Sequence, residues 1–155
     1  MPSKSQSAPS ALEDHLGYWL RFLSNHVSQS FAAKVESQGI SVAAWVVMRE
    51  MYDAEEINPS EIAARIGMTR GGITKIVERL VQDGFVVRRE REGDRRYQAI
   101  ALTTRGRRLV PILAKLADEN DAACFAPLTS LERASFLSTL KKLVSAHNLN
   151  QLPTE

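Results

Sequence analysis

This chain of 155 residues has only one cysteine, only short apolar runs and a small formal net charge. The one cysteine, Cys124, excludes an intramolecular disulfide framework and a four-cysteine zinc cluster. The apolar run at residues 43–48 is far shorter than the ~20 residues that cross a bilayer, and residues 1–10 lack the apolar core of a signal peptide. The length predicts one domain of ordinary size, and these absences predict a cytoplasmic protein without a membrane partner.

The formal net charge of +2 is too small to suggest a nucleic-acid partner. The charges are unevenly distributed, however. Residues 65–108 contain 12 Lys and Arg against 5 Asp and Glu, so this segment carries +7 and the rest of the chain −5. A basic segment within an acidic frame favours a localised surface for a polyanion, although a solvated arginine-rich face without a partner would give the same counts.

The N-terminal part of the chain has a helical pattern. Residues 1–9 are rich in Ser and Pro and predict a disordered tail. Over residues 10–40, apolar side chains recur in steps of three and four, and Ser10 with Glu13 fits a capping box. We therefore expect one long helix over this range. Residues 42–52, apolar on nearly all sides and preceded by Ser41, predict a second, buried helix.

Residues 60–80 have the spacing of a helix-turn-helix, opened by Asn58 and Pro59 as helix cap and first helical residue. Ala63 is small enough for two helices to approach closely, and Gly67 suits the turn, where a positive φ favours glycine. The inner face of the second helix is apolar: Ile73, Ile76, Val77 and Leu80. The outer face suits a major groove: Arg70, Gly71, Thr74, Lys75 and Arg79. An ordinary core helix pair is the alternative for this motif taken alone.

A β-hairpin is predicted next. Residues 85–89 and 97–102 are short β-prone runs around a charged turn at 90–96, with Gly93 near its tip. A helix-turn-helix followed by a basic hairpin is a winged helix. The arginines on or beside this wing are placed to reach phosphates or an adjacent minor groove: Arg88, Arg89, Arg91, Arg95 and Arg96.

Two further helices are expected after the hairpin. Thr103 is a suitable cap for the first, in which Pro111 should cause a kink or delay the start. Thr129 and Glu132 form a capping box for the second. The predicted fold class is mainly α with a small β-hairpin wing. Its predicted divisions are a tail (1–9), a dimerisation helix (10–40), a winged helix (41–102), C-terminal dimerisation helices (103–147) and a second tail (148–155).

The dimer is predicted because the flanking helices carry apolar stripes longer than the small core at 41–102 can cover. An uncovered apolar face of that length usually marks an interface. We expect the flanking helices to form an intertwined two-fold lobe, which would place two recognition helices about 34–36 Å apart. A larger monomeric helical bundle is the alternative.

Residues 94–106 (DRRYQAIALTTRG) resemble the wing-to-helix signature of MarR-type transcriptional regulators, an Asp-x-Arg followed by a strand and Leu-Thr-x-x-Gly. Residues 67–75 and 80–85 resemble that family's recognition helix and its exit into the wing. The resemblance covers residues 12 to about 146. It implies a homodimeric winged-helix regulator, usually a repressor, that binds a near-palindromic operator in double-stranded DNA.

The resemblance also implies roles for single residues. Arg96, with Arg95 beside it, would lie in the minor groove at the wing tip, braced by Asp94. The residues implied to face the major groove are Thr69, Arg70, Thr74 and Lys75. The Gly71-Gly72 pair departs from the bulkier residues often found in the family, which argues against base contacts from those two positions.

A small aromatic or phenolic effector, bound between the dimerisation and DNA-binding lobes, is implied as well. Aromatic side chains can stack on a ring, and an arginine can pair with a carboxylate. The candidates are Tyr18, Trp19 and Arg21 in the first helix and Trp45, Met48 and Arg49 in the second. Core packing and structural ion pairs are the alternative interpretation for each of the six.

The sequence contains no convincing sign of an enzyme, a cofactor or a metal site. Cys124 lies far from the start of the first helix, where a redox-sensing branch of the family carries its reactive cysteine, and is expected to pack as a small apolar group. His15, His26 and His147 lack a convincing metal-ligand spacing. The alternative to a DNA-binding regulator is a winged-helix module that binds another protein instead.

Overall fold

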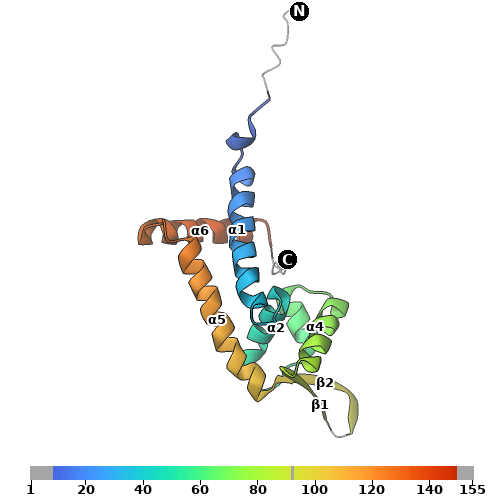
Figure 1. Ribbon diagram of the computed structural model, residues 1–155. Helices are drawn as coiled ribbons and strands as arrows, with labels where there is room; N and C mark the ends of the chain where they lie inside the picture. The colour runs from blue at the N-terminus through green and yellow to red at the C-terminus, as the bar shows by residue number, and fades with distance from the viewer. Residues whose placement is uncertain (1–8, 92, 150–155) are drawn as a thin grey trace, which may run out of the picture.

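The fold is a small winged-helix lobe from which long helices extend (Figure 1). The computed structural model describes residues 9–91 and 93–149, with the side chains of residues 91 and 94–97 outside the description. The elements in chain order are the 3₁₀ turn η1 (Leu12–Asp14), α1 (Leu16–Glu36), α2 (Val42–Tyr52), α3 (Pro59–Ile66), α4 (Arg70–Gln82), β1 (Val86–Arg91), β2 (Asp94–Leu102), α5 (Thr104–Cys124) and α6 (Ser130–Ala146). The predicted fold class is confirmed.

The core lies where α2, α3, α4, the base of the hairpin and the first half of α5 meet. Its fully buried side chains include Met48 of α2, Ile62 of α3, Ile73 of α4 and Leu113 of α5. The hairpin is tied to this core by Ile57, whose backbone N–H and C=O both bond to Ile100 at 3.0 and 2.9 Å. The winged-helix lobe therefore holds its α-helices and its hairpin in one packed unit.

The hairpin is longer than predicted. β1 and β2 pair antiparallel from Val86 opposite Leu102, and after an irregularity beyond Glu90 the last pair is Arg91 opposite Asp94. The predicted charged turn at residues 90–96 was therefore too wide, because exposed charged side chains do not prevent backbone pairing between strands. Gly93 does lie at the turn, with φ +88°.

The first helix begins later than predicted. α1 starts at Leu16, and the Ser10–Glu13 capping box is wrong: the Asp14 carboxylate accepts the Ala11 N–H at 3.0 Å. His15 is extended (φ −99°, ψ 125°), and its ring Nδ1 lies 3.0 Å from the Ala11 carbonyl oxygen. The side chain of His15 thus meets a backbone group near the chain start, and the helical pattern is interrupted before α1.

The other predicted helix starts are confirmed. The side chains of Ser41, Asn58 and Thr103 accept backbone N–H groups at 3.1, 2.8 and 3.1 Å, and Thr129 with Glu132 forms the expected capping box. Pro111 does not delay α5, which begins at Thr104. We attribute this to packing, because Val110 and Leu113 on either side of the proline are buried in the core.

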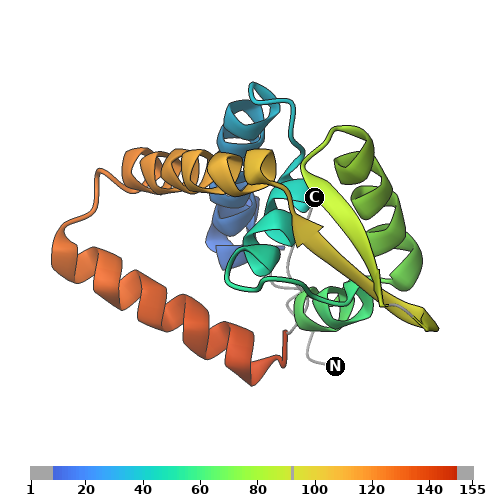
Figure 2. The same cartoon turned by 90° about the horizontal axis from the view of Figure 1, so that it is seen from below.

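The flanking helices leave large apolar side chains uncovered within one chain. α6 contains no buried residue and follows α5 at the end remote from the hairpin (Figures 1 and 2). Leu16 of α1 is 88% exposed and Leu131 of α6 is 81% exposed. Within the described residues, none of the helices combines the length and the apolar character needed to cross a membrane.

Candidate nucleic-acid interface

The helix-turn-helix is built by α3, the turn at Gly67 and α4. Gly67 has φ +71°, which an L side chain would adopt only under strain. Ala63 is buried at the contact between the helices, and the Thr69 hydroxyl caps α4 by accepting the Gly72 N–H at 3.1 Å. Ile73, Val77 and Leu80 face inward and are at most 2% exposed. The opposite side of α4 is left to solvent.

The exposed side of α4 carries the side chains predicted to face DNA. Arg70 and Lys75 are exposed, and neither forms an ion pair with any described residue. Thr74 donates its hydroxyl proton to the Arg70 carbonyl at 2.8 Å, whereas the Arg79 Nε lies 2.9 Å from the Asp83 carboxylate. The two cations near the start of α4 are thus more available to an anion than Arg79 is.

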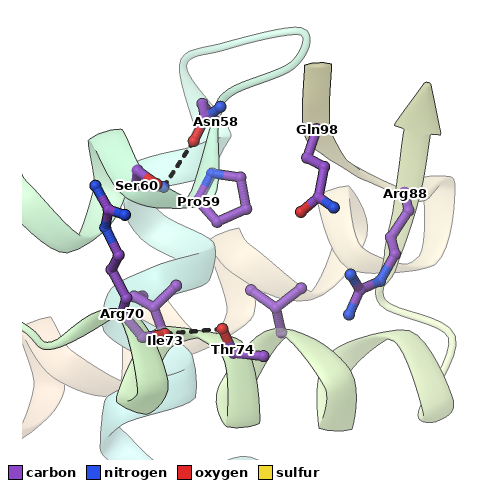
Figure 3. Close-up of a pocket in the computed structure, with 9 residues that line it drawn as sticks. Asn58, Pro59, Ser60, Arg70, Ile73, Thr74, Arg88 and Gln98 are labelled. Carbon is purple, nitrogen blue, oxygen red and sulfur yellow. Dashed lines mark hydrogen bonds between the residues drawn. The ribbon is translucent and has the colours of Figure 1, made fainter. Parts of the chain in front are cut away.

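A cleft of about 280 Å³ separates α4 from the wing. Figure 3 shows Arg70 on one side of this cleft, Arg88 of β1 on the other, and Gln98 of β2 pointing in between them. The start of α3 closes one end with Pro59 and Ser60, and Ile73 and Thr74 contribute from α4. Two guanidinium groups facing one cleft form a region of positive potential.

The outer part of the wing is described by its backbone alone. Arg91 and Asp94 pair at the end of the hairpin, with Gly93 at the turn, so Arg95 and Arg96 follow directly in β2. The side chains of these four charged residues lie outside the described part of the chain. The assignment of Arg95 and Arg96 to a minor groove, and of Asp94 as their brace, therefore stays a prediction.

The six predicted effector residues do not gather at one place. Tyr18 and Trp19 stack edge to face with centroids 5.3 Å apart, and the Trp19 indole donates to the Glu13 carbonyl at 2.9 Å. Met48 is fully buried in the core. The Arg49 guanidinium bonds to the Asp53 carboxylate at 2.8 Å, which raises the pKa of Arg49 above its ordinary value. Arg21 is exposed on α1.

Trp45 does line a cavity, of about 330 Å³, enclosed by α1, α2 and α5. Its wall includes Phe31 and Asn120, which the sequence analysis did not select. Asn120 is 3% exposed and is the one buried polar residue in the described part of the chain. It accepts from the Lys34 ammonium at 3.0 Å and donates to the Val27 carbonyl at 3.2 Å. A signal in the sequence was available, because Asn120 continues the helical spacing of the apolar residues Leu113 and Leu116 and is therefore expected on their buried face.

A comparison with protein-family models matches residues 38–96 to the MarR family, a range that includes α2, the helix-turn-helix and most of the hairpin. This segment of the chain is therefore similar to the MarR family. The MarR match covers all of α4 and the cleft residues up to Arg88, so the geometry described above lies largely within the family's own segment.

Curated relatives of this chain are named as transcription regulators. The HTH-type transcriptional repressor YetL of Bacillus subtilis is 34% identical over 85 residues, which are 54% of this chain and 49% of YetL. The match therefore spans about half the length of that relative. The HTH-type transcriptional regulator BilQ of Clostridium symbiosum is 24% identical over 132 residues, 85% of this chain and 92% of BilQ. Both relatives are named as transcription regulators, and neither name is that of an enzyme.

Solved structures share the fold of this chain. BpsR of Bordetella bronchiseptica, whose DNA binding is regulated by 6-hydroxynicotinic acid, superposes with a TM-score of 0.76 at 20% identity, over 88% of this chain and 99% of that one. A mutant of MarR from E. coli in complex with operator DNA has a TM-score of 0.73 at 24% identity, over 83% and 93% of the two chains.

Proposed function

We propose that this protein is a cytoplasmic transcription regulator of the MarR family, most simply a repressor, that binds a near-palindromic operator as a homodimer. The observation that carries the proposal is the exposed face of α4, with Arg70 and Arg88 on opposite sides of the cleft beside it. This surface lies within the segment of net charge +7. A cationic ridge next to a cationic cleft is complementary to the phosphates that border a major groove.

The side chains on this surface have different proposed contacts, according to their positions. Arg70 and Lys75 extend from α4 toward the groove floor, where arginine and lysine pair with guanine edges. Arg88 lies across the cleft on β1 and is placed for a backbone phosphate. The hydroxyls of Thr69 and Thr74 already bond to backbone groups of α4. Their proposed role is to stabilise the helix and to let its backbone lie close to the DNA. Arg95 and Arg96 extend the contact into the minor groove from the wing, with Asp94 as their brace.

The homodimer follows from the uncovered apolar faces of α1 and α6. Side chains such as Leu16, Leu131 and Leu143 are 50% exposed or more in the single chain, which costs free energy unless another surface covers them. A second copy supplies a matching surface through two-fold symmetry. The same symmetry repeats α4 and matches an inverted repeat in the operator. The repressor role is supported by the name of the relative YetL.

The effector we propose is a small aromatic acid held in the cavity between α1, α2 and α5. Trp45 and Phe31 provide aromatic surface, and Asn120 provides a buried amide at the wall. Because Lys34 bonds to Asn120, a carboxylate entering beside the amide would meet a cation already in place. The fold neighbour BpsR responds to a molecule of this class.

DNA binding is tested by selecting bound sequences from random duplexes and then measuring affinity against salt concentration. We expect an inverted repeat with half-sites about 10 bp apart and a log–log slope of about −0.9 per phosphate contacted. Absence of duplex binding at low salt would contradict this function and favour a winged-helix module that binds a protein.

The effector is tested by titrating 6-hydroxynicotinic acid and salicylic acid against the protein–operator complex, with Asn120→Leu as the variant. We expect release of DNA from the unmodified protein and a much weaker response from the variant. Arg49→Ala, outside the cavity wall, serves as the matched control. An equal response from all three proteins would contradict the assignment of this cavity.

A further inference from the structure

The start of α5 is bonded to the end of α4 through three successive backbone carbonyls. The Asp83 carbonyl accepts from the Arg105 Nη1 at 2.7 Å, and the Gly84 carbonyl accepts from the Thr103 hydroxyl at 2.8 Å. The Phe85 carbonyl accepts from the Thr103 backbone N–H at 3.0 Å. We call residues 83–85 and 103–106 the α4–α5 joint. Its two halves are about twenty residues apart in sequence and are brought together by the return of the hairpin.

The end of α4 leaves these carbonyls available. Gly84 has φ +75°, and the N–H groups of Gly84 and Phe85 bond back to the carbonyls of Val81 and Leu80 at 3.1 and 2.9 Å. This is the Schellman arrangement, which satisfies the last helical carbonyls and turns the next ones outward. The carbonyls of residues 83–85 then need partners from elsewhere, and α5 provides them.

The joint is also closely packed. A Cβ atom on Gly106 would lie 2.2 Å from the Phe85 carbonyl oxygen, so this position of α5 accepts no side chain without movement of the backbone. The Arg105 guanidinium lies over the Phe85 ring, 4.4 Å from its centroid. Arg105 thus contacts both a backbone carbonyl and an aromatic face at the base of the wing.

α5 connects this joint to the rest of the molecule. Near its start, Arg107 donates to the carbonyls of Tyr52 and Ala54 at 2.9 and 2.7 Å, at the end of α2. Farther along, Asn120 bonds to Lys34 and Val27 of α1. One continuous helix therefore runs from the end of the recognition helix to α1 and α6 (Figure 1).

We propose that Arg105 and Thr103 are positioning residues that fix the angle between α4 and α5, and thereby the operator spacing that the dimer recognises. This inference rests on the proposed function. In a two-fold dimer, the separation of the two α4 helices depends on how each winged-helix lobe is oriented on the flanking helices. Neither residue needs to touch DNA for this role, because both act through the backbone at the end of α4.

The test compares three duplexes: the selected operator and the same operator with its spacer one base pair longer or shorter. One base pair turns one half-site relative to the other by about 34°, from the helical repeat of DNA. The variants are Arg105→Ala and Thr103→Val, of which the second changes no charge. The control is Lys115→Ala, which removes a cation from an exposed site on the same helix, outside the basic segment.

We expect the unmodified protein and Lys115→Ala to prefer one spacer strongly. Arg105→Ala should bind that spacer about tenfold less tightly, as expected if about a tenth of the free protein then holds the required angle, and should discriminate much less among the three spacers. Its salt slope should not change. Thr103→Val should shift the spacer profile in the same direction, and thermal melts should show that both variants remain folded.

Two results would overturn the positioning role while leaving DNA binding intact. In the first, Arg105→Ala weakens all three duplexes by the same factor and reduces the salt slope by about 0.9, which identifies a direct phosphate contact. In the second, both variants keep the original spacer profile. Failure of the unmodified protein to select an inverted repeat would instead overturn the proposed function, on which this inference rests.

Discussion

The winged-helix lobe and the helices that flank it differ in how they cover their apolar residues. In the lobe, Ile62, Ile66 and Ile73 are at most 1% exposed, so the chain completes this core by itself. In the flanks, Leu16 and Leu131 are more than 80% exposed. Both regions have helical apolar spacing in the sequence. The lobe, completed by Val35 of α1 and by Val110 and Leu113 of α5, thus buries its apolar side chains within one chain, whereas the start of α1 and all of α6 bury none of theirs.

The largest expected effect comes from placing a charge in the flanks. Leu143→Lys would put a cation where a second copy is expected to pack, and should convert the dimer to monomers. The gain from binding two half-sites together is about 10²- to 10⁴-fold, so operator affinity should fall by that order. Sedimentation velocity and operator titration measure the two effects. A variant that stays dimeric would show that α6 lies outside the interface.

A core substitution in the lobe should act differently. Leu113→Ala removes a fully buried side chain where α5 meets the lobe, and should lower the free energy of unfolding by about 2–5 kcal/mol. Urea unfolding measures the change. Because the lost contacts are within one chain, this decrease in the free energy of unfolding should not depend on protein concentration. The effect of Leu143→Lys on dimer formation should depend on it. A loss that grows on dilution would mean that the lobe also depends on the partner.

A smaller effect is expected at the cleft beside α4. Arg88→Ala should weaken operator binding about tenfold and reduce the salt slope by about 0.9, because one phosphate contact is lost. Arg89 is the next residue on β1, and its side chain leaves the opposite face of the hairpin. Arg89→Ala should therefore cost less affinity under the same conditions. Equal losses would indicate that only the summed charge of the wing matters.

The smallest effect is expected at the start of α6. Hydrogen bonds from the Thr129 backbone N–H and hydroxyl, at 2.8 and 2.9 Å, lower the pKa of Glu132 below its ordinary value of 4.5. A lowered pKa in the folded chain means that the contribution of this cap is complete above pH 4.5 and is lost as the pH falls through the lowered pKa. Amide hydrogen exchange in the first turn of α6, expressed relative to the intrinsic rate at each pH, should quicken in that range. Glu132→Gln should remove this pH dependence.

Much of the local structure was predictable because its causes lie within a few residues. Asn58 and Thr103 cap helices whose first N–H groups are two or three positions away, and Gly67 marks a turn by its own backbone freedom. The same local reasoning failed at Ser10 and Glu13. There the Asp14 carboxylate, and not that of Glu13, accepts a backbone N–H, and a short-range pattern does not rank neighbouring acids.

The exposed face of α4 in the candidate site was predictable from the sequence, whereas the cleft between α4 and the wing was not. Helical spacing placed Arg70 on the outer side of α4, and β-prone runs placed Arg88 on the hairpin. Their position on opposite sides of one cleft depends on how the hairpin packs against α4. The hydrogen bond from Lys34 to Asn120 joins residues 86 positions apart, so no local pattern contains it.

Most helix caps, the apolar spacing, the segregation of basic residues and the resemblance to the MarR family can be read from the amino-acid sequence alone. The caps and the spacing are properties of residues a few positions apart, and the other two are properties of continuous segments of the chain. The burial of Met48, the place of Trp45 at a cavity wall and the bond of Arg105 to the end of α4 come instead from the tertiary structure. Those outcomes depend on packing between distant segments, where small differences in helix orientation determine which side chains meet.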